Sequence, residues 1–307
     1  MRKVLVATEK PFAKTAVDGI SYVFKEAGYE LILLENYKDK NDLLTAVGDV
    51  DAVIVRSDLV TKEVIEAGSK LKIVVRAGAG YDNIDLVSST DKGIVVMNTP
   101  GQNSNAVAEL AIGMMVYLAR NYFTGTSGTE LRGKRLGVFA CGNIGKDIAR
   151  IANGFGMTVF GFDPFVEREV IESAGMKYLE SAEELYSLCH YVSLNAPAVN
   201  ETIRSVNYGL LGKMPKPAVL VNTARKEIID EDSLLKMFAE RPDFKYISDI
   251  APDCSAELAE KYPGRFFFTP KKMGAQTSEA NINAGIAAAR QIVDFLESDD
   301  RTFQVNS

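Results

Sequence analysis

The stretch 134–163 constrains the fold of this 307-residue chain more than any other. It opens with a short apolar run, Leu136 to Ala140, which has the length of a buried parallel strand. A turn of small residues follows, and apolar side chains then recur at helical spacing from Ile144 to Ala152. A second apolar run, Met157 to Phe162, ends at Asp163. Strand, turn, helix and strand together predict one βαβ unit of a parallel sheet.

The turn of this unit has the character of a dinucleotide site. Backbone N–H groups at the start of the helix would face a pyrophosphate, where the helix dipole favours negative charge. Asp163 would accept hydrogen bonds from the adenosine ribose and repel a 2′-phosphate, so the site favours NAD over NADP. The fingerprint expects Gly-x-Gly-x-x-Gly, and Ala140 stands at the first glycine. A glycine-rich turn that binds no nucleotide is the alternative. The residues expected at the cofactor are Gly142, Asn143, Ile144, Gly145 and Asp163.

Composition excludes several classes of partner. A net charge of −6 without a basic run argues against nucleic acid and against an anionic membrane surface. The most apolar long segment, Ala106 to Ala119, contains Glu109 and is too short to span a bilayer. The first ten residues resemble a strand rather than a signal peptide. Three cysteines without a CxxC motif indicate reduced thiols, and no metal site is expected. These features predict a cytoplasmic enzyme.

Strand and helix patterns alternate on both sides of the 134–163 stretch. With 307 residues and 47% apolar side chains, the chain has room for two packed cores. Alternation of this kind predicts two α/β domains, each a doubly wound parallel sheet. An apolar stripe from Val107 to Leu118 predicts a long buried helix between them. A last helix, about Ser278 to Leu296, is long enough to pack back on the first domain. The strands expected in the first domain are 3–7, 31–34, 52–55, 72–75 and 94–97, and those expected after Asp163 are 191–195, 218–222, 245–249 and 266–269.

Three strand ends carry unusual chemistry, and ligands of open α/β sheets bind outside the carboxyl ends of strands. The loop at 76–83 offers backbone N–H groups to an anion, although a plain tight turn is the alternative. Arg225 suits bidentate binding of a carboxylate, and a surface ion pair with a nearby acid is its alternative. Lys271 and Lys272 follow the third strand, where a solvated surface pair is the ordinary interpretation. The single histidine, His190, suits capping or packing better than catalysis.

With these motifs identified, nearly the whole chain resembles the D-2-hydroxyacid dehydrogenase family. Within it, the chain is most similar to the short 3-phosphoglycerate dehydrogenases that lack a regulatory domain. The resemblance implies a flavodoxin-like substrate domain (1–99 plus 284–307), a Rossmann NAD-binding domain (100–283), an active site in the cleft and a homodimer. The matched stretches are RAGAGYDNID (76–85), VVMNTPGQNSNAVAEL (95–110), GVFACGNIGKDIA (137–149), LVNTARKEIIDEDSL (220–234) and GAQTSEANINAG (274–285).

The same resemblance implies roles for single residues. The family's substrate-orienting arginine falls on Arg225. An arginine for a substrate phosphate falls on Arg56, and Asn103 opens the connecting helix beside the substrate. The remaining implied substrate contacts are Ser57, Ala77, Gly78, Ala79 and Gly80, and the remaining implied cofactor contacts are Thr223, Ala224 and Asp249.

Two positions depart from the family. Lys272 stands where the catalytic histidine is expected, and Cys254 stands where the glutamate that holds this histidine is expected. A glutamate partner would keep a lysine protonated, whereas nearby cations and desolvation would depress its pKa. We therefore expect Lys272 to act as the acid/base, as in a lysine variant known among the short enzymes. Asp253 is a weaker candidate to replace the glutamate.

The function implied by this pattern is NAD-dependent oxidation of 3-phospho-D-glycerate to 3-phosphohydroxypyruvate, the entry step of serine synthesis. The nearest alternative is the same chemistry on glyoxylate, hydroxypyruvate or pyruvate. An NAD-sensing protein similar to the corepressors of the same fold is an alternative of another class. Lost catalytic residues would favour the sensor, whereas Arg225 and the anion loop favour an enzyme.

Overall fold

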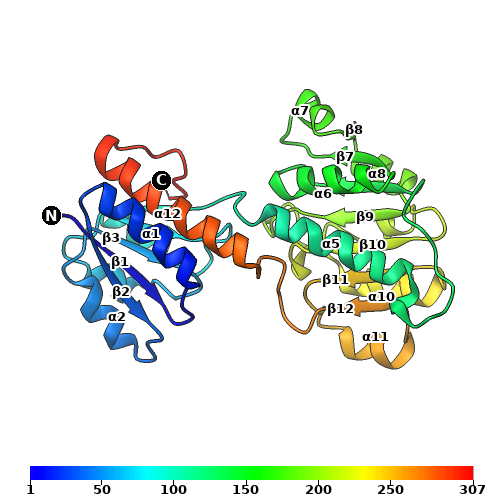
Figure 1. The fold of residues 1–307 in the computed structure, drawn as a ribbon. Helices are drawn as coiled ribbons and strands as arrows, with labels where there is room; N and C mark the ends of the chain where they lie inside the picture. The colour runs from blue at the N-terminus through cyan, green and yellow to red at the C-terminus, as the bar shows by residue number, and fades with distance from the viewer. Residues whose placement is uncertain (307) are drawn as a thin grey trace. The chain divides into compact units, whose positions relative to one another are not determined.

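The computed structural model describes residues 1–306, which form two compact units (Figure 1). The first unit comprises Met1–Asn103 and the C-terminal segment from Ala275, and the second comprises Ser104–Gly274. The sequence had placed these boundaries at 99/100 and 283/284. The difference at the second boundary has a simple reason, since the last helix belongs as a whole to the first unit.

The first unit contains a five-stranded sheet in the order β2-β1-β3-β4-β5, and all four pairings are parallel. This is the flavodoxin-like order of a doubly wound sheet, as predicted. The short apolar runs of the sequence form the strands, and β3 and β5 are buried along their whole length. The strands are β1 (Lys3–Thr8), β2 (Glu30–Glu35), β3 (Ala52–Val55), β4 (Ile73–Arg76) and β5 (Val95–Asn98).

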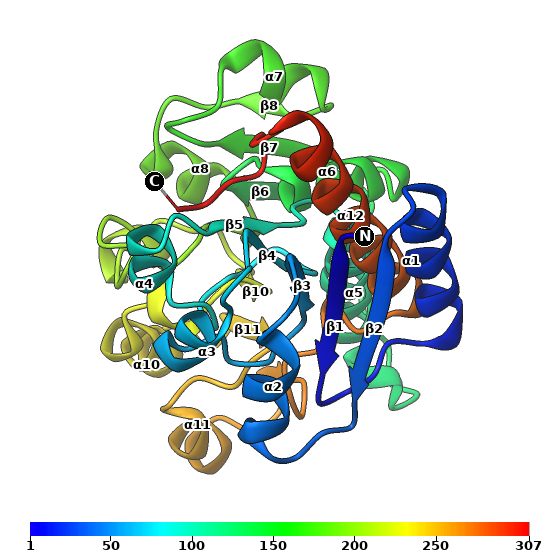
Figure 2. The ribbon, with the colours of Figure 1, turned by 90° about the vertical axis from the view of Figure 1, so that its left-hand side faces the viewer.

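Helices cover both faces of this sheet. Alternate strand residues point to opposite faces, so Val4 and Val6 meet one group of helices while Leu5 and Ala7 meet the other. Helices α1 and α12 lie on one face and α2 and α3 on the other (Figure 2). The expectation that the last helix packs on the first unit is confirmed. The helices are α1 (Lys14–Glu26), α2 (Lys40–Val47), α3 (Lys62–Ala67), α4 (Leu86–Asp91) and α12 (Ser278–Ser298).

The second unit contains a seven-stranded parallel sheet in the order β12-β11-β10-β9-β6-β7-β8. Counted from β6, this is the Rossmann order 3-2-1-4-5-6 with one further strand at the edge. The strands are β6 (Arg135–Phe139), β7 (Thr158–Phe162), β8 (Lys177–Tyr178), β9 (Tyr191–Leu194), β10 (Val219–Asn222), β11 (Lys245–Ser248) and β12 (Phe266–Phe268).

Helices α5 and α6 pack on one face of this sheet, and α8 and α10 pack on the other (Figure 1). The predicted connecting helix is α5, which buries Ala111, Met115 and Leu118. The helical segments are α5 (Ser104–Ala119), η1 (Asn121–Phe123), α6 (Asn143–Gly154), α7 (Arg168–Ser173), α8 (Ala182–Leu188), α9 (Tyr208–Leu211), η2 (Lys226–Ile228), α10 (Glu231–Glu240) and α11 (Ser255–Lys261).

None of the helices within residues 1–306 is both long and apolar enough to cross a membrane. In the same part of the chain, no group of three or more His, Cys, Asp or Glu side chains is placed to hold a metal ion.

Candidate active site

The turn between β6 and α6 has the backbone of a phosphate-binding loop. Ala140 adopts a left-handed φ of 72°, which explains why the fingerprint prefers glycine there. A Cβ atom on Gly145 would lie 2.5 Å from the Ala140 carbonyl oxygen, so only glycine lets helix and strand pack this closely. A Cβ on Gly142 would meet nothing within 4 Å. The backbone at Gly142 is therefore open to a ligand.

Asp163 is fixed at the end of β7 by two backbone hydrogen bonds. The N–H of Cys141 donates to one carboxylate oxygen at 2.8 Å, and the N–H of Phe165 donates to the other at 2.9 Å. The carboxylate is thereby tied to the turn that begins at Ala140, and each oxygen keeps a lone pair for a ribose hydroxyl. Burial, and then the charge of Asp163, raise the pKa of the Cys141 thiol to about 12. Cys141 is therefore a packing residue rather than a reactive one.

Asn222 shapes the turn that carries Arg225. Asn222 is fully buried at the end of β10. Its amide nitrogen donates to the carbonyl of Arg225 at 3.0 Å, and its amide oxygen accepts from the N–H of Ala224 at 2.9 Å. Asn222 was not predicted from the sequence, although a polar residue that ends an otherwise apolar strand is a usable signal.

The carbonyl oxygen of Ala224 brings the two cations expected at the site together. Arg225 Nη1 donates to it at 3.0 Å, and Lys272 Nζ donates to it at 3.0 Å from another loop. The two nitrogens are therefore separated by no more than twice that distance. A pair of cations this close can hold a carboxylate beside a carbonyl or alkoxide oxygen. The structure thus places the predicted acid/base and the predicted orienting arginine in one cluster.

Asp249 holds the loop that carries Lys272. Its carboxylate, which is almost fully buried, accepts hydrogen bonds from Thr269 Oγ1 at 3.0 Å and from the N–H groups of Met273 at 2.9 Å and Gly274 at 2.8 Å. These donors lie on both sides of Lys272. Asp249 is predicted at the cofactor, and the hydrogen bonds its carboxylate accepts all come from its own unit. Its visible role is to fix the 269–274 loop.

Cys254, which the resemblance places at the position of the family glutamate, lies beside Glu231. The N–H groups of Asp253 and Cys254 both donate to the carboxylate of Glu231, at 2.8 and 2.7 Å. The Asp253 carboxylate is exposed and forms an ion pair with Lys226. The Asp253 carboxylate is therefore paired with Lys226, which argues against it as a substitute partner for Lys272. Burial, and then Glu231, raise the pKa of the Cys254 thiol to about 12, so the thiol stays neutral.

In the first unit, the loop Ala77–Gly80 follows β4 and is held by backbone contacts. The N–H of Thr99 donates to the Gly78 carbonyl at 3.0 Å, and the Asn98 amide donates to the Ala79 carbonyl at 2.6 Å. Gly78 has a φ of 149°, and a Cβ there would lie 1.4 Å from a guanidinium nitrogen of Arg76. Arg76 therefore lies directly against the anion loop. Arg76 was not predicted as a site residue, although it begins the RAGAG run of the sequence.

Arg56 has many partners within the first unit. Its Nη1 donates to the carbonyls of Lys10 at 3.1 Å and Pro11 at 3.2 Å, and its Nη2 donates to Asn281 Oδ1 at 2.5 Å. Its guanidinium also lies over the ring of Phe12 at 5.1 Å. Burial lowers its pKa. Arg56 thus ties the loop after β1 to the start of α12, and a phosphate would have to replace part of these contacts.

Ser57, Asn103 and His190 are the remaining residues for which the sequence predicts a role. Ser57 follows Arg56 and is exposed, and Asn103 directly precedes α5 in a half-buried turn. His190 lies at the start of β9, where its Nδ1 accepts from the N–H of Arg135 at 3.4 Å. Burial, followed by the charges of Arg135 and Lys134, lowers the pKa of His190. Its contacts agree with the packing role predicted for it.

The second unit fits a dinucleotide at the carboxyl end of its sheet. The first turn of α6 has no side-chain cap, so its N–H groups are available to a phosphate. Thr223 Oγ1 is buried without a hydrogen-bond partner among the 306 described residues. A buried hydroxyl of this kind suits a polar group of a bound ligand. Gly142, Asp163 and Thr223 all follow strands of one parallel sheet and therefore lie at one edge of it.

Comparison with known proteins gives one family. The model of the D-isomer specific 2-hydroxyacid dehydrogenase catalytic domain matches residues 12–306. The crystal structure of an NAD⁺-bound 3-phosphoglycerate dehydrogenase of Entamoeba histolytica is 48% identical, with a TM-score of 0.88 over 100% of this chain and 99% of that one.

Curated relatives point the same way. A D-3-phosphoglycerate dehydrogenase of Methanocaldococcus jannaschii is 35% identical over 85% of this chain and 52% of its own length. A hydroxypyruvate reductase of Thermotoga maritima is 33% identical over 86% of this chain and 90% of its own length. The chain spans about half the length of the curated phosphoglycerate dehydrogenases it matches.

Proposed function

The chain belongs to the D-isomer specific 2-hydroxyacid dehydrogenase family, and from this we propose that it oxidises 3-phospho-D-glycerate to 3-phosphohydroxypyruvate with NAD, the entry step of serine biosynthesis. Support for this substrate comes from two similar proteins that carry the name phosphoglycerate dehydrogenase. The observation that carries the chemistry is the convergence of Lys272 and Arg225 on the Ala224 carbonyl.

The proposed reaction needs one hydride and one proton to leave the substrate. Bound NAD⁺ would supply the hydride acceptor for the hydrogen on C2. Lys272, as the neutral amine, takes the proton of the C2 hydroxyl and returns it in the reverse direction. Arg225 stabilises the developing charge on that oxygen and orients the neighbouring carboxylate. The products are the 2-keto acid, NADH and the protonated lysine, which releases its proton to solvent.

The roles of the other substrate and cofactor residues are those that the resemblance implies, and each role is supported by contacts within one of the two units. The loop Ala77–Gly80 offers its backbone to the substrate carboxylate, and Arg56 serves the phosphate. Gly142 and Asp163 serve the pyrophosphate and the adenosine ribose. Asp163 at the end of β7 is the reason to expect NAD rather than NADP.

A second candidate, reduction of hydroxypyruvate or glyoxylate, has one observation in its favour. The guanidinium of Arg56 already donates to two carbonyls and to Asn281, which leaves it less available to a phosphate. The similarity to a hydroxypyruvate reductase points in the same direction. The two candidates share Lys272 and Arg225 and differ only at the substrate's distal end.

The test is the fall in NADH absorbance when keto acids are added to purified protein. Phosphohydroxypyruvate should be reduced with a higher kcat/KM than hydroxypyruvate or glyoxylate. A preference for hydroxypyruvate would transfer the proposal to the second candidate. If no keto acid is reduced while NADH still binds, the chain is not an enzyme of this class and the sensor interpretation replaces it.

The role of Lys272 has its own test. Lys272→Ala should lower kcat by about 10²–10⁴-fold, the usual contribution of a general acid or base, while the Kd for NADH stays unchanged. Lys271→Ala is the matched control, because it removes the neighbouring ammonium and should keep turnover within a few-fold. Near-full turnover of Lys272→Ala would move the proton role to another group.

We also propose that the protein is a cytoplasmic homodimer. The homodimer is implied by the resemblance to the dehydrogenase family, and the three free cysteines support a reducing compartment. Small-molecule substrate and NAD are the only other partners proposed.

A further inference from the structure

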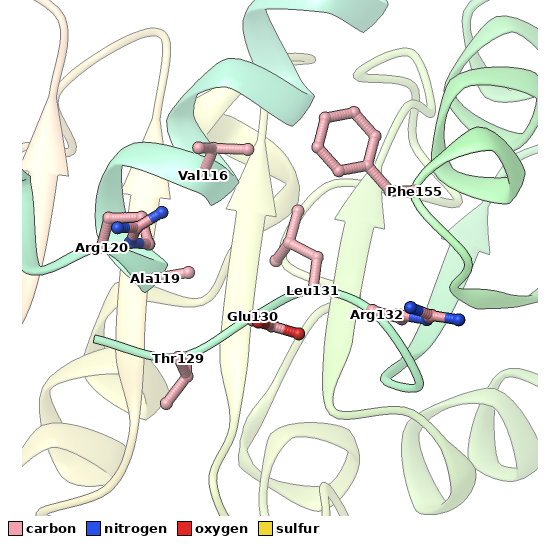
Figure 3. A pocket seen from close by; sticks show the side chains of 8 residues that line it. All are labelled: Val116, Ala119, Arg120, Thr129, Glu130, Leu131, Arg132 and Phe155. Atoms are coloured by element: carbon pink, nitrogen blue, oxygen red, sulfur yellow. The ribbon is translucent and has the colours of Figure 1, made fainter. Parts of the chain in front are cut away.

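The pocket shown in Figure 3 lies in the second unit at the C-terminal end of α5. Its lining residues, which fall between Val116 and Phe155, include none of those predicted to bind substrate or cofactor. The predicted substrate residues of the first unit are organised by a different feature, the carboxylate of Asp58. This acid follows β3 and is only 5% exposed.

Three donors converge on the carboxylate of Asp58. The N–H of Glu9 donates to Oδ1 at 2.6 Å, and the N–H of Arg56 donates to Oδ2 at 3.2 Å. The hydroxyl of Tyr37 also donates to Oδ1, at 2.9 Å. Burial, and then the charge of Asp58, raise the pKa of Tyr37, so this hydroxyl keeps the proton that it donates. A buried acid is unfavourable unless its oxygens are hydrogen-bonded, and here both are.

These contacts join the loops at the carboxyl edge of the first sheet. Glu9 directly follows β1, Tyr37 lies just after β2, and Arg56 directly follows β3. The amide of Asn83, in the loop after β4, donates to the Asp58 carbonyl at 2.7 Å. Asp58 thus links the loops of four neighbouring strands, β2-β1-β3-β4. Ligands of open parallel sheets bind at this edge, so a residue that fixes its loops also fixes the surroundings of a ligand.

Arg56 depends on Asp58 at both of its ends. Asp58 holds the backbone N–H of Arg56, from which the side chain starts. The same carboxylate holds the N–H of Glu9. The next two residues, Lys10 and Pro11, provide the carbonyls that accept from Arg56 Nη1 at 3.1 and 3.2 Å. One buried acid therefore sets both the origin and the support of this guanidinium.

We propose that Asp58 is a positioning residue for substrate specificity, which holds Arg56 where its guanidinium binds the phosphate at the distal end of the substrate. This rests on the proposed function, which assigns that phosphate to Arg56. An arginine whose position is set before binding loses less conformational freedom when the phosphate binds, so the phosphorylated substrate gains affinity. Lys272 and Arg225 belong to the second unit, and the proton transfer does not depend on Asp58.

The substitution Asp58→Asn tests this role. It keeps the shape of the side chain and replaces one acceptor oxygen with an NH₂ group. Whichever way the amide turns, its NH₂ faces the N–H of Arg56 or that of Glu9, and one loop loses its hydrogen bond. KM for phosphohydroxypyruvate should rise by about fivefold or more. KM for hydroxypyruvate, kcat for both substrates and the Kd for NADH should each stay within about twofold.

Asp51→Asn is the matched control. Asp51 directly precedes β3 at the opposite edge of the same sheet, and its carboxylate accepts the N–H of Lys3 at 3.0 Å and the ammonium of Lys72 at 3.1 Å. Both substitutions should lower the melting temperature, because each places an NH₂ group against a donor. Only Asp58→Asn should raise KM for phosphohydroxypyruvate. Equal rises in the two variants, or equal rises for the two substrates, overturn the assignment.

A double variant shows whether Asp58 acts through Arg56. With Arg56→Ala already present, Asp58→Asn should change KM for phosphohydroxypyruvate by less than about twofold, because the effects of residues that act through one another do not add. If the two increases multiply instead, Asp58 acts by another route and the proposal fails.

Crystal structures of the variants provide a readout that needs no activity. In Asp58→Asn the Arg56 guanidinium should leave the carbonyls of Lys10 and Pro11, whereas in Asp51→Asn it should keep both contacts. An unmoved guanidinium in Asp58→Asn overturns the proposal even if KM changes. If the parent protein does not prefer phosphohydroxypyruvate, the proposed substrate is wrong, and these structures alone decide whether Asp58 positions Arg56.

Discussion

Ala140 is the residue where the sequence departs from the dinucleotide fingerprint, and the structure shows the consequence. Its φ of 72° costs an alanine about 1–2 kcal/mol relative to glycine, while glycine loses more backbone entropy on folding. The Cys141 N–H bond to Asp163 and the packing of Gly145 hold the turn in this conformation despite the methyl group. The turn therefore keeps the backbone geometry of the fingerprint, although alanine replaces its first glycine.

This conformation predicts a stabilising substitution. Ala140→Gly should raise the free energy of unfolding by about 1 kcal/mol, measured from urea midpoints at constant m. Ala259→Gly, an exposed position inside α11, is the matched control and should lower it by about as much. A loss of stability in Ala140→Gly would show that the methyl group contributes packing that outweighs the strain.

The contacts of Arg56 bear directly on its proposed role, which is to bind the substrate phosphate. If it serves a phosphate, Arg56→Ala should raise KM for phosphohydroxypyruvate by about tenfold or more and leave KM for hydroxypyruvate within about twofold. Its lost bonds to two carbonyls and Asn281 should also cost about 1–3 kcal/mol of stability. Asn281→Ala, which removes one of these structural partners alone, is the control. Equal rises in both KM values would leave Arg56 a purely structural residue.

Single residues differ in how much of their role can be predicted from the sequence. The positions of Gly142, Asp163 and Arg225 followed from strand ends and turn chemistry, because parallel strands deliver their carboxyl ends to one edge. The hydrogen bonds of Arg56 did not, because its partners, Lys10, Pro11 and Asn281, come from loops and helix starts far apart in the sequence.

At the scale of elements, the 269–274 loop behaves as one fixed piece. The single hydroxyl hydrogen of Thr269 is shared between two acceptors, the carboxylate of Asp249 at 3.0 Å and the carbonyl of Lys271 at 2.9 Å. Asp249 in turn receives the N–H groups that follow Lys272. The lysine side chain therefore projects from a segment anchored before and after it. Such support raises the reaction rate because the catalytic side chain is already in position when the substrate binds.

Loosening this support should lower turnover without removing a reacting group. Thr269→Val keeps the volume, loses both hydroxyl bonds and should reduce kcat by about tenfold while the Kd for NADH stays unchanged. Thr269→Ser keeps the hydroxyl and should restore the rate. Asp249→Asn should have a larger effect, because an amide NH₂ would face the N–H of Gly274. An unchanged kcat in Thr269→Val would mean that the loop is held well enough without it.

Elements were predicted unevenly, and the reason is their length. All strands of four or more residues appeared as apolar runs, and α5 and α12 appeared as apolar stripes. Helices α4, α7 and α9 and strand β8 were not predicted; all four are short, and a short element shows little of a periodic pattern, although the equally short α3 was predicted, at 61–67. For α4, the signal that was available is the cap: the Asp85 side chain accepts the N–H of Ser88.

Across the whole molecule, the three cysteines predict how stability depends on pH. Burial raises the pKa of each thiol from 9.0 to about 12, with added contributions from nearby acids at Cys141 and Cys254. Between these values the folded protein keeps protons that the unfolded chain releases. Stability is therefore full below about pH 9 and falls as the pH rises toward 12.

This dependence can be measured by melting curves. The melting temperature should fall by at least about 5 °C between pH 8 and pH 10.5. Cys189→Ala, which removes one buried thiol, should reduce the slope. A melting temperature that stays constant over this interval would show that the thiols titrate normally in the folded protein.

Helix α12 has a consequence for how the protein is made. Ala284, Ala288 and Ile292 of this helix complete the core that Ile20 and Phe24 of α1 begin. The two halves of that core are separated by the entire second unit, so the α1 surface of a nascent chain stays uncovered until α12 has been translated. The Rossmann unit in between can fold first, whereas the first unit cannot complete its core before α12 has been made. During that interval its apolar face is the natural target of a chaperone.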